Sequence, residues 1–531
     1  MNILLIAIYI VAGIYLILNF KYDIQMLQQN SYRIDRYWRW LKGKKLTAWR
    51  LVDVALLFLL FMYIVPKEFS ALAIALVAIA KCAIISRRKY KKPLVFTRRV
   101  WRIYGVTGFI AAAIYVAVIL LSPSWTEGGL YSPVQISLGV LLLMTIGSYV
   151  IVTLAVEILT PVEKKINQHY YDDAARILRS MPDLKIIGIT GSYGKTSTKH
   201  YLDRILAEEF DVLMTPGSYN TPMGVIRTVR EMMKPYNQIF ICEMGAKQVG
   251  DIKEICDLVH PQIGIVTAVG PMHLESFKSI ENVQSTKFEL VDALPADGLA
   301  VINNDFEYCA NRPVDNVEAI RYAVSSPSGA QFTASDIEYS PLGTTFKVNG
   351  PDGFTMDVAT KLVGECNISN LLGAIVVALH LGMKPASIRN AVAQIEQVEH
   401  RLNMKRTPGG VTIIDDAFNS NPTGSKMAVD VLSAFKTGKR IIVTPGMIEL
   451  GERQYELNRE LGKHIGGNVD VAIVVGDYNR EALEKGIREG GLDGDALILA
   501  DSFNHAQQIL GGLLASGDVV LYENDLPDTF K

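Results

Sequence analysis

Cysteine is scarce in this sequence, and the positions of the few cysteines exclude two kinds of scaffold. The chain has 531 residues and only five cysteines, which are Cys82, Cys242, Cys256, Cys309 and Cys366. They are odd in number and scattered, and no two have the spacing of a metal-binding pair, so neither a disulfide framework nor a structural zinc site is indicated. We therefore expect a reducing compartment.

Acidic residues are scarce in the first third of the chain. Up to Val162 there are 18 Lys and Arg against 6 Asp and Glu, whereas the remainder has 35 against 48. The positive charge lies beside long apolar runs rather than in a pattern typical of nucleic-acid recognition, so we expect no nucleic-acid partner. The division predicts a membrane part followed by an acidic soluble part.

Five apolar stretches in this first part are candidates for transmembrane helices. Asn2–Phe20 lacks a basic n-region and a cleavage site, which favours an anchor over a signal peptide. Leu51–Val65 and Ala71–Ile85 are shorter, and form either a hairpin of two helices or one re-entrant pair. Tyr104–Leu121 and Val134–Leu159 are long enough to cross a bilayer.

Basic residues are concentrated in alternate connections between these stretches. Eight lie between the first and second stretches and eight between the third and fourth, whereas the other two connections contain only Lys67. The positive-inside rule then makes both basic loops and everything after Pro161 cytoplasmic. Aromatic residues in the loops are typical of a membrane interface; the alternative is that the loops bind an anionic lipid headgroup or a pyrophosphate-linked substrate. Asp53 and Lys81 lie near span ends, which gives a transport pathway little support.

A phosphate-binding loop follows the membrane part. Lys185–Thr190 is an apolar, strand-forming run, a glycine-containing turn ends at Gly194, and a helical pattern begins at Lys195. Backbone N–H groups of such a turn point at an anion, and the helix adds its positive dipole end. Lys195 would reach the β/γ-phosphates and Thr196 would offer a hydroxyl to Mg²⁺. The usual glycine five positions before Gly194 is missing, but the order of strand, turn and helix still predicts ATP binding.

Polar side chains end or follow several buried strands of the soluble part. Glu243 ends the run Gln238–Cys242, and His273 follows the run Ile263–Val269. Ligands bind at the carboxyl edge of an open parallel sheet, so Glu243 is well placed to hold Mg²⁺. Lys287 lies on a predicted helix, 282–293.

Together with later segments, these motifs resemble the Mur ligase family of ATP-dependent amino-acid and peptide ligases. The resemblance covers Leu184 to the C-terminus, in the family's order. The family's loop has the pattern T-G-(S/T)-x-G-K-(S/T), which explains the displaced glycine. The segments that carry the resemblance are Ile189–Ser197, Thr215–Gly224, Glu243–Ala246, His273–Glu275, Thr286–Lys287, Asn367–Asn370, His400–Leu402, Asp415–Pro422 and Gly446–Glu452.

The resemblance and the strand pattern imply an α/β fold behind a helical membrane part. We expect a membrane part of about five transmembrane helices at 1–162 and a juxtamembrane helix at 163–183. A central P-loop ATP-binding domain at 184–399 contains a β-rich excursion at about 310–363. The strands from Thr412 onward alternate with helices and predict a C-terminal doubly wound, Rossmann-like domain at 400–531.

The resemblance also assigns roles to individual residues. Lys195, His273 and Lys287 would be catalytic. Thr196 and Glu243 would hold one Mg²⁺, and His273 with a carbamoylated Lys287 would hold a second. The nucleotide would be bound by Gly191, Ser192, Gly194, Lys195, Thr196, Ser197, Asn367, Asn370, Arg401, Asp416 and Asn419, and the other substrates by Asn220, Thr221 and Glu449. Asn303 or Asn304 would contact the nucleotide or cap a strand.

The implied activity is amide formation through an acyl phosphate at the cytoplasmic face of the membrane. A site of this kind must neutralise crowded negative charge, which suits the lysines and Mg²⁺. Among family members the motifs favour those that add D-alanyl-D-alanine to a muramoyl tripeptide. The expected partners are cell-wall precursor peptides and dipeptides, the lipid bilayer, and other enzymes of cell-wall synthesis.

The chain departs from the family at its front. The small uridine-nucleotide-binding domain of the soluble members is missing, so the acceptor is either nucleotide-linked and recognised elsewhere or already attached to lipid. A γ-linked polyglutamate synthetase is a rival within the family. An ATP-driven transporter or sensor and an inactive scaffold are rivals outside it, and the intact set Lys195, Glu243, His273 and Lys287 argues against the scaffold.

Overall fold

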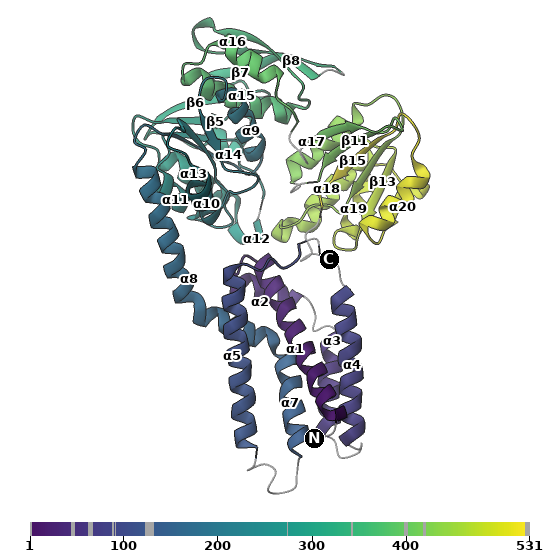
Figure 1. The fold of residues 1–531 in the computed structure, drawn as a ribbon. Coiled ribbons are helices and arrows are strands. Elements are labelled where there is room, and N and C mark those ends of the chain that lie inside the picture. The colour runs from purple at the N-terminus through teal and green to yellow at the C-terminus, as the bar shows by residue number, and fades with distance from the viewer. Residues whose placement is uncertain are drawn as a thin grey trace. The chain divides into compact units, whose positions relative to one another are not determined.

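The computed structural model describes residues 3–43, 48–61, 67–87, 90, 92–122, 132–272, 274–340, 343–397, 402–417 and 421–525. The chain forms two compact units (Figure 1), of which the first is helical and extends to Gln168, and the second begins at His169. Each unit is described in its own frame below.

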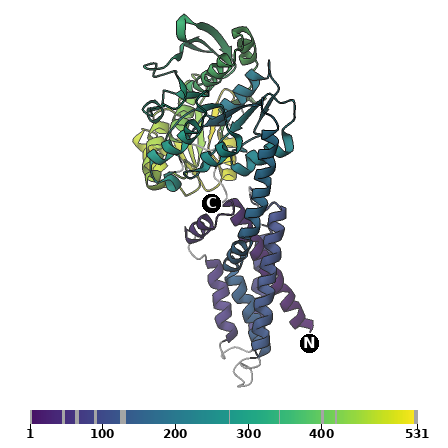
Figure 2. The ribbon, with the colours of Figure 1, turned by 90° about the vertical axis from the view of Figure 1, so that its left-hand side faces the viewer.

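The first unit is a bundle of helices. Its helices are α1 (Ile3–Gln29), α2 (Ile34–Gly43), α3 (Ala48–Phe61), α4 (Lys67–Arg87), α5 (Arg98–Leu121), α7 (Pro133–Ile146) and the first part of α8 (Ser148–Arg179). Helix α1 packs against α4, α5 and α7, and α3 packs against α4 and α7. The long helices run alongside one another in both side views (Figures 1 and 2).

Three of these helices are long and apolar enough to cross a membrane, namely α1, α4 from Phe69 onward, and α5. A fourth span exists only if α7 and α8 count as one bent span, because the chain turns by 69° between them. The span predicted at Val134–Leu159 is thus interrupted by a bend. The break falls at Gly147 and Ser148, the kind of pair at which sharp helix kinks occur.

The bundle has an apolar outer face, and several polar side chains lie buried among the apolar residues of its core. On α1, Ile3, Ile10 and Ile17 are exposed, and Phe109 of α5 has an exposed fraction of 75%. Asp23, Asp53, Lys81, Gln135 and Ser148 are all buried. A soluble protein distributes these side chains the other way round, whereas in hydrocarbon polar residues face the bundle interior.

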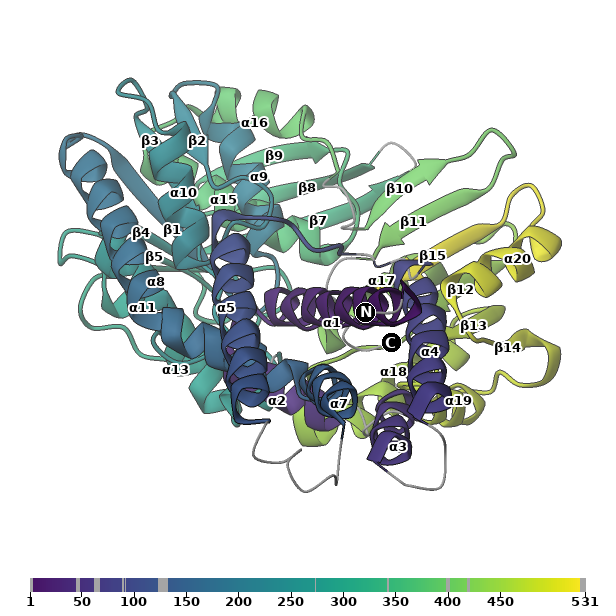
Figure 3. The ribbon, with the colours of Figure 1, turned by 60° about the horizontal axis from the view of Figure 1, so that its bottom comes forward.

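The second unit begins with a nine-stranded sheet of order β2-β3-β1-β4-β5-β6-β7-β8-β9. Pairing is parallel up to β7 and antiparallel from β7 to β9 (Figure 3). The expected β-rich excursion is thus the far edge of the same sheet. The strands are β1 (Lys185–Thr190), β2 (Val212–Met214), β3 (Ile239–Glu243), β4 (Ile263–Val266), β5 (Leu299–Asn303), β6 (Glu318–Ala323), β7 (Phe332–Ser340), β8 (Gly343–Asn349) and β9 (Thr355–Thr360).

Helices cover both faces of this sheet because its strands are buried on both sides. Ile187 and Ile189 belong to one core and Ile186 to the other, as the alternation along a strand requires. The first core includes α9 (Lys195–Leu206), α15 (Glu365–His380) and α16 (Pro385–Ala393). The second includes the end of α8 with α10 (Pro222–Met232), α11 (Asp251–Val259), α12 (Leu274–Phe277), α13 (Ile280–Asp292) and α14 (Glu307–Ala310).

A second, six-stranded sheet of order β10-β11-β15-β12-β13-β14 forms the C-terminal domain. Only β10 and β11 pair antiparallel, and the remaining pairs are parallel. Its strands are β10 (Asn403–Arg406), β11 (Thr412–Asp416), β12 (Arg440–Thr444), β13 (Val471–Val475), β14 (Leu497–Ala500) and β15 (Val519–Glu523), with helices α17 (Pro422–Ser433), α18 (Gln454–Gly466), α19 (Arg480–Glu489) and α20 (Phe503–Leu513). The predicted doubly wound domain is confirmed.

Candidate active site

The phosphate-binding loop has the predicted order of strand, turn and helix. It leaves the sheet at Thr190 and enters α9 at Lys195. Gly194 has φ = 80°, a conformation that favours glycine, and a Cβ atom there would lie 2.1 Å from Asn370 Oδ1. The backbone N–H of Ser192 donates to the carbonyl of Ala268 at 2.7 Å, which fixes the loop to the segment after β4.

Lys195 lies over the backbone of this loop. Its ammonium donates to the carbonyl oxygens of Gly191 at 2.6 Å and of Ser192 at 3.3 Å. A cavity of about 80 Å³ opens beside it, lined by Ser192, Tyr193, Gly194, Lys195, Thr196, Ser197, Ser218, Asn220, Glu243, Met272 and Asn421. The loop residues predicted to bind phosphate and the predicted metal-binding pair therefore share one cavity.

Glu243 ends β3 with its carboxylate buried under polar groups. Thr196 Oγ1 lies 3.1 Å from both carboxylate oxygens, and Asn220 Nδ2 donates to one of them at 3.0 Å. The ammonium of Lys199 lies 3.0 Å from the other. Burial alone would raise the pKa of Glu243, but the charges of Lys199 and then Lys195 outweigh it and keep that pKa below its ordinary value.

Lys199 was not predicted from the sequence, and its side chain is fully buried. Its ammonium also donates to the carbonyl of Gly217. The available signal was its position three residues after Thr196, which places both on one face of α9. Asn220, predicted to bind substrate, contacts the Glu243 carboxylate. Thr221, predicted likewise, caps α10 by accepting from the N–H of Gly224 at 3.3 Å.

Lys287 lies on α13 and is buried, with an exposed fraction of 4%. Burial, with a further contribution from the charge of Lys195, lowers the pKa of Lys287 to about 7. Its ammonium lies 6.0 Å from the ring centroid of Phe277. The lysine is therefore not an ordinary solvated helix residue, since a substantial fraction of its amine is neutral near pH 7. His273, Arg401 and Asn419 lie outside the described residues.

The asparagines of α15 tie that helix to α9. Asn367 Oδ1 accepts from the hydroxyl of Tyr201 at 2.8 Å, and Asn370 Oδ1 accepts from Thr198 Oγ1 at 3.3 Å. Asn303 Nδ2 donates to Thr267 O and Ser369 Oγ, both at 2.9 Å. Asn370 adjoins the loop directly through its contact with Gly194, whereas Asn304 turns away to the carbonyl of Ser328.

Two predicted residues of the C-terminal domain are described. Asp416 ends β11 and accepts from the backbone N–H of Leu402 at 3.2 Å. Glu449 lies in the connection between β12 and α18 with φ = 62°, unusual for a residue with a side chain. Asn421, which belongs to the Asp415–Pro422 motif but had no predicted role, is the one described residue of this domain that lines the loop cavity.

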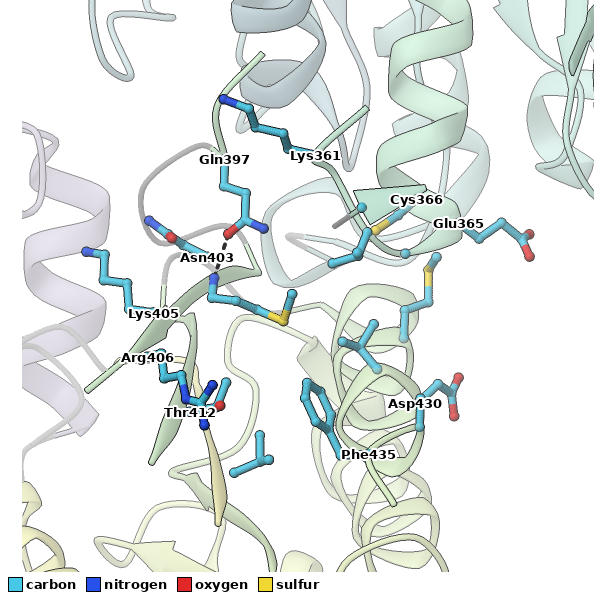
Figure 4. A pocket seen from close by; sticks show the side chains of 18 of the residues that line it. Lys361, Glu365, Cys366, Gln397, Asn403, Lys405, Arg406, Thr412, Asp430 and Phe435 are labelled. Carbon is cyan, nitrogen blue, oxygen red and sulfur yellow. Dashed lines mark hydrogen bonds between the residues drawn. The ribbon is translucent and has the colours of Figure 1, made fainter. Parts of the chain in front are cut away.

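A larger cavity of about 1630 Å³ lies elsewhere in the second unit (Figure 4). Its lining includes Lys361, Cys366, Arg406 and Phe435, and Met404 N donates to Gln397 Oε1 at 2.7 Å. Among the described residues, no predicted site residue lines it. The described part of the chain also has no group of three or more His, Cys, Asp or Glu arranged to hold a metal ion. We therefore take the smaller cavity, beside the phosphate-binding loop, as the candidate active site.

The fold and this loop define a P-loop nucleotide-binding α/β protein with a second, doubly wound domain. Comparison with known families shows which family within this class the chain belongs to. The Mur ligase middle domain matches residues 189–378, and the glutamate ligase domain of the Mur ligases matches residues 400–522. The chain belongs to the Mur ligase family, which confirms the predicted family and its fold.

Several relatives are UDP-N-acetylmuramoyl-tripeptide–D-alanyl-D-alanine ligases. The one from Mycobacterium tuberculosis is 31% identical over 64% of this chain and 70% of its own length. Those from Haemophilus influenzae and Bacillus subtilis are both 28% identical, over 57% and 52% of this chain. The chain spans less than two thirds of the length of these last two relatives, 66% and 59%.

Solved structures of MurF have the same fold. MurF from Acinetobacter baumannii is 24% identical, with a TM-score of 0.62 over 68% of this chain and 78% of its own. MurF from Thermotoga maritima in complex with ADP is 25% identical, with a TM-score of 0.60 over 68% of this chain and 80% of its own.

Proposed function

We propose that this protein is a membrane-anchored ligase that uses ATP to join D-alanyl-D-alanine to a muramoyl tripeptide. The observation that carries the proposal is the shared cavity of the phosphate loop, Thr196 and Glu243 in a chain of this family. Relatives that carry this activity in their names support the choice of substrates. The reaction would pass through an acyl phosphate, because a carboxylate is a poor electrophile until ATP phosphorylates it.

The residues of the cavity fit ATP with Mg²⁺. A hydroxyl and a carboxylate are oxygen ligands of the kind Mg²⁺ prefers, and Thr196 and Glu243 already lie within 3.1 Å of each other. They would hold one ion, which neutralises phosphate charge when bound. Lys195 would turn from the carbonyls of its own loop to the phosphate oxygens. The remaining phosphate oxygens would be bound by backbone N–H groups of the loop other than that of Ser192, which donates to Ala268.

Lys287 fits the predicted carbamoylation. Only a neutral amine adds to carbon dioxide, and burial brings the pKa of Lys287 to about 7. The carbamate would turn a buried cation into an anionic oxygen ligand, which together with His273 suits a second Mg²⁺ near the acceptor carboxylate.

The helical unit would lie in the cytoplasmic membrane and the two α/β domains in the cytoplasm. The apolar outer face of the bundle, together with the polar side chains buried in its core, supports the first point. The two basic connections support the second. Residues of both connections contact the same end of α1, since Tyr22 lies near Trp40 and Tyr90, and Gln25 Nε2 donates to the carbonyl of Lys92 at 3.1 Å.

A second candidate for the acceptor is a muramoyl tripeptide already attached to lipid. The membrane-type bundle at the chain's front, where soluble members have a uridine-nucleotide-binding domain, favours it. Synthesis of γ-linked polyglutamate is a further alternative, but the named relatives favour the dipeptide.

The test uses the full chain in detergent with ATP, Mg²⁺ and D-alanyl-D-alanine. Nucleotide-linked and lipid-linked muramoyl tripeptide are offered separately, and ADP release and product mass are followed. We expect a product heavier by the dipeptide with at least one acceptor. No product with either acceptor overturns the assignment, and turnover with the lipid-linked acceptor alone selects the second candidate.

A further inference from the structure

At the start of α5, two arginines share one carboxylate, and one of them makes only a distant ion pair with it. Arg102 of α5 donates two hydrogen bonds to the carboxylate of Glu163 on α8, at 2.6 and 2.9 Å, one to each oxygen. Arg99, one turn earlier, approaches the same carboxylate only to 3.8 Å, which is too long for a hydrogen bond. Its guanidinium instead lies 4.1 Å from the ring centroid of Tyr32.

The cluster therefore has one anion and two cations, and the anion is taken. The Nε atom of Arg99 is shielded from solvent and has no hydrogen-bond acceptor among the described residues. Other inward cations of this unit are better matched. Lys81 lies 2.7 Å from Asp53, and Arg50 lies 3.5 Å from Asp23 and also donates to the carbonyl of Ile146. A shielded N–H without an acceptor carries a free-energy cost that an incoming anion would remove.

The surroundings of Arg99 indicate that such an anion belongs to a lipid. Phe96 lies 5.3 Å from Trp101 and 6.0 Å from Tyr104, measured between ring centroids. Trp101 is 63% exposed and Phe96 is 48% exposed, whereas Tyr37 in the neighbouring aromatic cluster is fully buried. Exposed aromatic side chains next to arginines at the end of an apolar helix are typical of the headgroup level of a bilayer.

We propose that Arg99 is the centre of a binding site for the phosphodiester group of an anionic glycerophospholipid. The planar guanidinium can donate two parallel hydrogen bonds to a phosphate, and the cluster's one surplus positive charge matches one monoanionic phosphodiester. Tyr32 and the Arg102–Glu163 pair hold the guanidinium in place, and Phe96 and Trp101 contact the acyl region. The proposal rests on the placement of the bundle in a membrane, not on the ligase activity.

The test is native mass spectrometry of the full chain, purified in detergent and titrated with phosphatidylglycerol or phosphatidylcholine. We expect the wild type to retain one phosphatidylglycerol at about tenfold lower lipid concentration than phosphatidylcholine, because the choline cation of phosphatidylcholine cancels the charge of its phosphodiester and is repelled by the surplus cation of the cluster. Arg99→Gln should reduce that preference to about twofold or less. Arg98→Gln is the matched control, because it removes the same charge from the neighbouring exposed position and should keep the preference.

Four results would overturn the proposal, and the same titration is repeated with inorganic phosphate and with an isoprenoid diphosphate to test two of them. Equal effects of Arg99→Gln and Arg98→Gln would show general charge attraction rather than a site. Displacement of the lipid by inorganic phosphate would show a soluble ligand, and tighter retention of an isoprenoid diphosphate would show a different occupant. If Arg99→Gln does not fold, Arg99→Lys keeps the charge without the planar fork, and undiminished preference in that variant likewise contradicts the site. No ligation is measured, so the outcome is separate from that of the proposed function.

Discussion

The buried ammonium of Lys199 compensates the charge of the Glu243 carboxylate. We expect Lys199→Met to lower the free energy of unfolding by about 3 kcal/mol, because it leaves a buried carboxylate without its cation. Added Mg²⁺ with ADP should restore much of this loss, since the metal would bring positive charge to the same carboxylate. Urea unfolding with and without Mg²⁺–ADP measures both effects, and Lys185→Met, at an exposed position, is the control. A loss of the same size in both conditions would assign Lys199 a purely structural role.

The ammonium of Lys195, which the loop would place against phosphate, should contribute more to nucleotide binding than that of Lys199. Lys195→Ala is expected to abolish ATP turnover and to weaken ADP binding at least about tenfold, because a charge-assisted contact to phosphate is lost. Isothermal titration with Mg²⁺–ADP measures the binding. Normal turnover in this variant would refute the assignment of the loop.

Asp203, one turn after Lys199 on α9, should make the stability of the central domain depend on pH. Burial raises the pKa of Asp203 to about 6, although Lys199 and Arg204 act against it. The native carboxyl therefore binds its proton more tightly than the unfolded chain, where the pKa is about 3.9. Its contribution to stability is full below pH 4 and is lost as the pH rises through 6.

The matching variant is Asp203→Asn, which cannot ionise. We expect it to exceed the wild type in free energy of unfolding by about 1 kcal/mol at pH 7.5, a value discounted for the partial exposure of this side chain, and to match it at pH 4. Urea unfolding at pH 4, 5, 6 and 7.5 follows the divergence. A difference that does not change with pH would mean that the carboxyl titrates normally.

The site shows which residues a sequence can reveal. The loop and Glu243 could be predicted because each stands at the end of a buried strand, and the apolar runs in the sequence identify those strands. Lys199 could not be assigned its partner in the same way, because the contact forms only when β1 and β3 pair in parallel and bring α9 over the end of β3. The burial of Lys287 likewise depends on the packing of α13 against the sheet.

At the scale of elements, a buried ion pair joins α3 and α4, with Tyr15 of α1 as a third member. Lys81 lies 2.7 Å from Asp53, and Tyr15 donates to the other carboxylate oxygen at 2.9 Å. We expect Lys81→Met or Asp53→Asn alone to destabilise the bundle by about 3 kcal/mol, because each leaves its partner less well compensated. The double variant should recover part of that loss.

Thermal unfolding of the four proteins in one detergent completes this double-mutant cycle. If the double variant loses less stability than the sum of the two single losses, the difference measures the interaction between Lys81 and Asp53, apart from the packing of each side chain. Strictly additive losses would show that the two side chains stabilise the bundle independently.

The same pair shows why the helices were harder to predict than the sheets. Hydropathy placed Asp53 and Lys81 near span ends and assigned them no partner, since pairing between helices leaves no mark in a local window. It also treated Val134–Leu159 as one span, because Gly147 and Ser148 are neutral in an apolar average. In the structure Ser148 Oγ donates to the buried carboxylate of Asp23 on α1, a contact made at the bend between α7 and α8.

At the scale of the whole molecule, the division between the two units falls within α8. The residues of α8 after Gln168 belong to the core of the second unit, where Ala174 and Leu178 are buried. Arg230 of α10 forms an ion pair with Asp173 at 2.7 Å and lies 4.3 Å from the ring centroid of Tyr170. The sequence predicted a juxtamembrane helix at 163–183, but its two roles became visible only from the side chains that it buries.

This division predicts where the chain can be cut. A fragment that begins at His169 keeps the end of α8 on its core, so it should be soluble without detergent and bind Mg²⁺–ADP within about twofold of the full chain. A fragment that begins at Asp183 loses the burial of Ala174 and Leu178 together with the Asp173–Arg230 pair, and should be less stable by about 3 kcal/mol. Urea unfolding and ADP titration compare the two fragments. Equal stability would show that the end of α8 contributes nothing to the second unit, and failure of the longer fragment to fold would show that the bundle does.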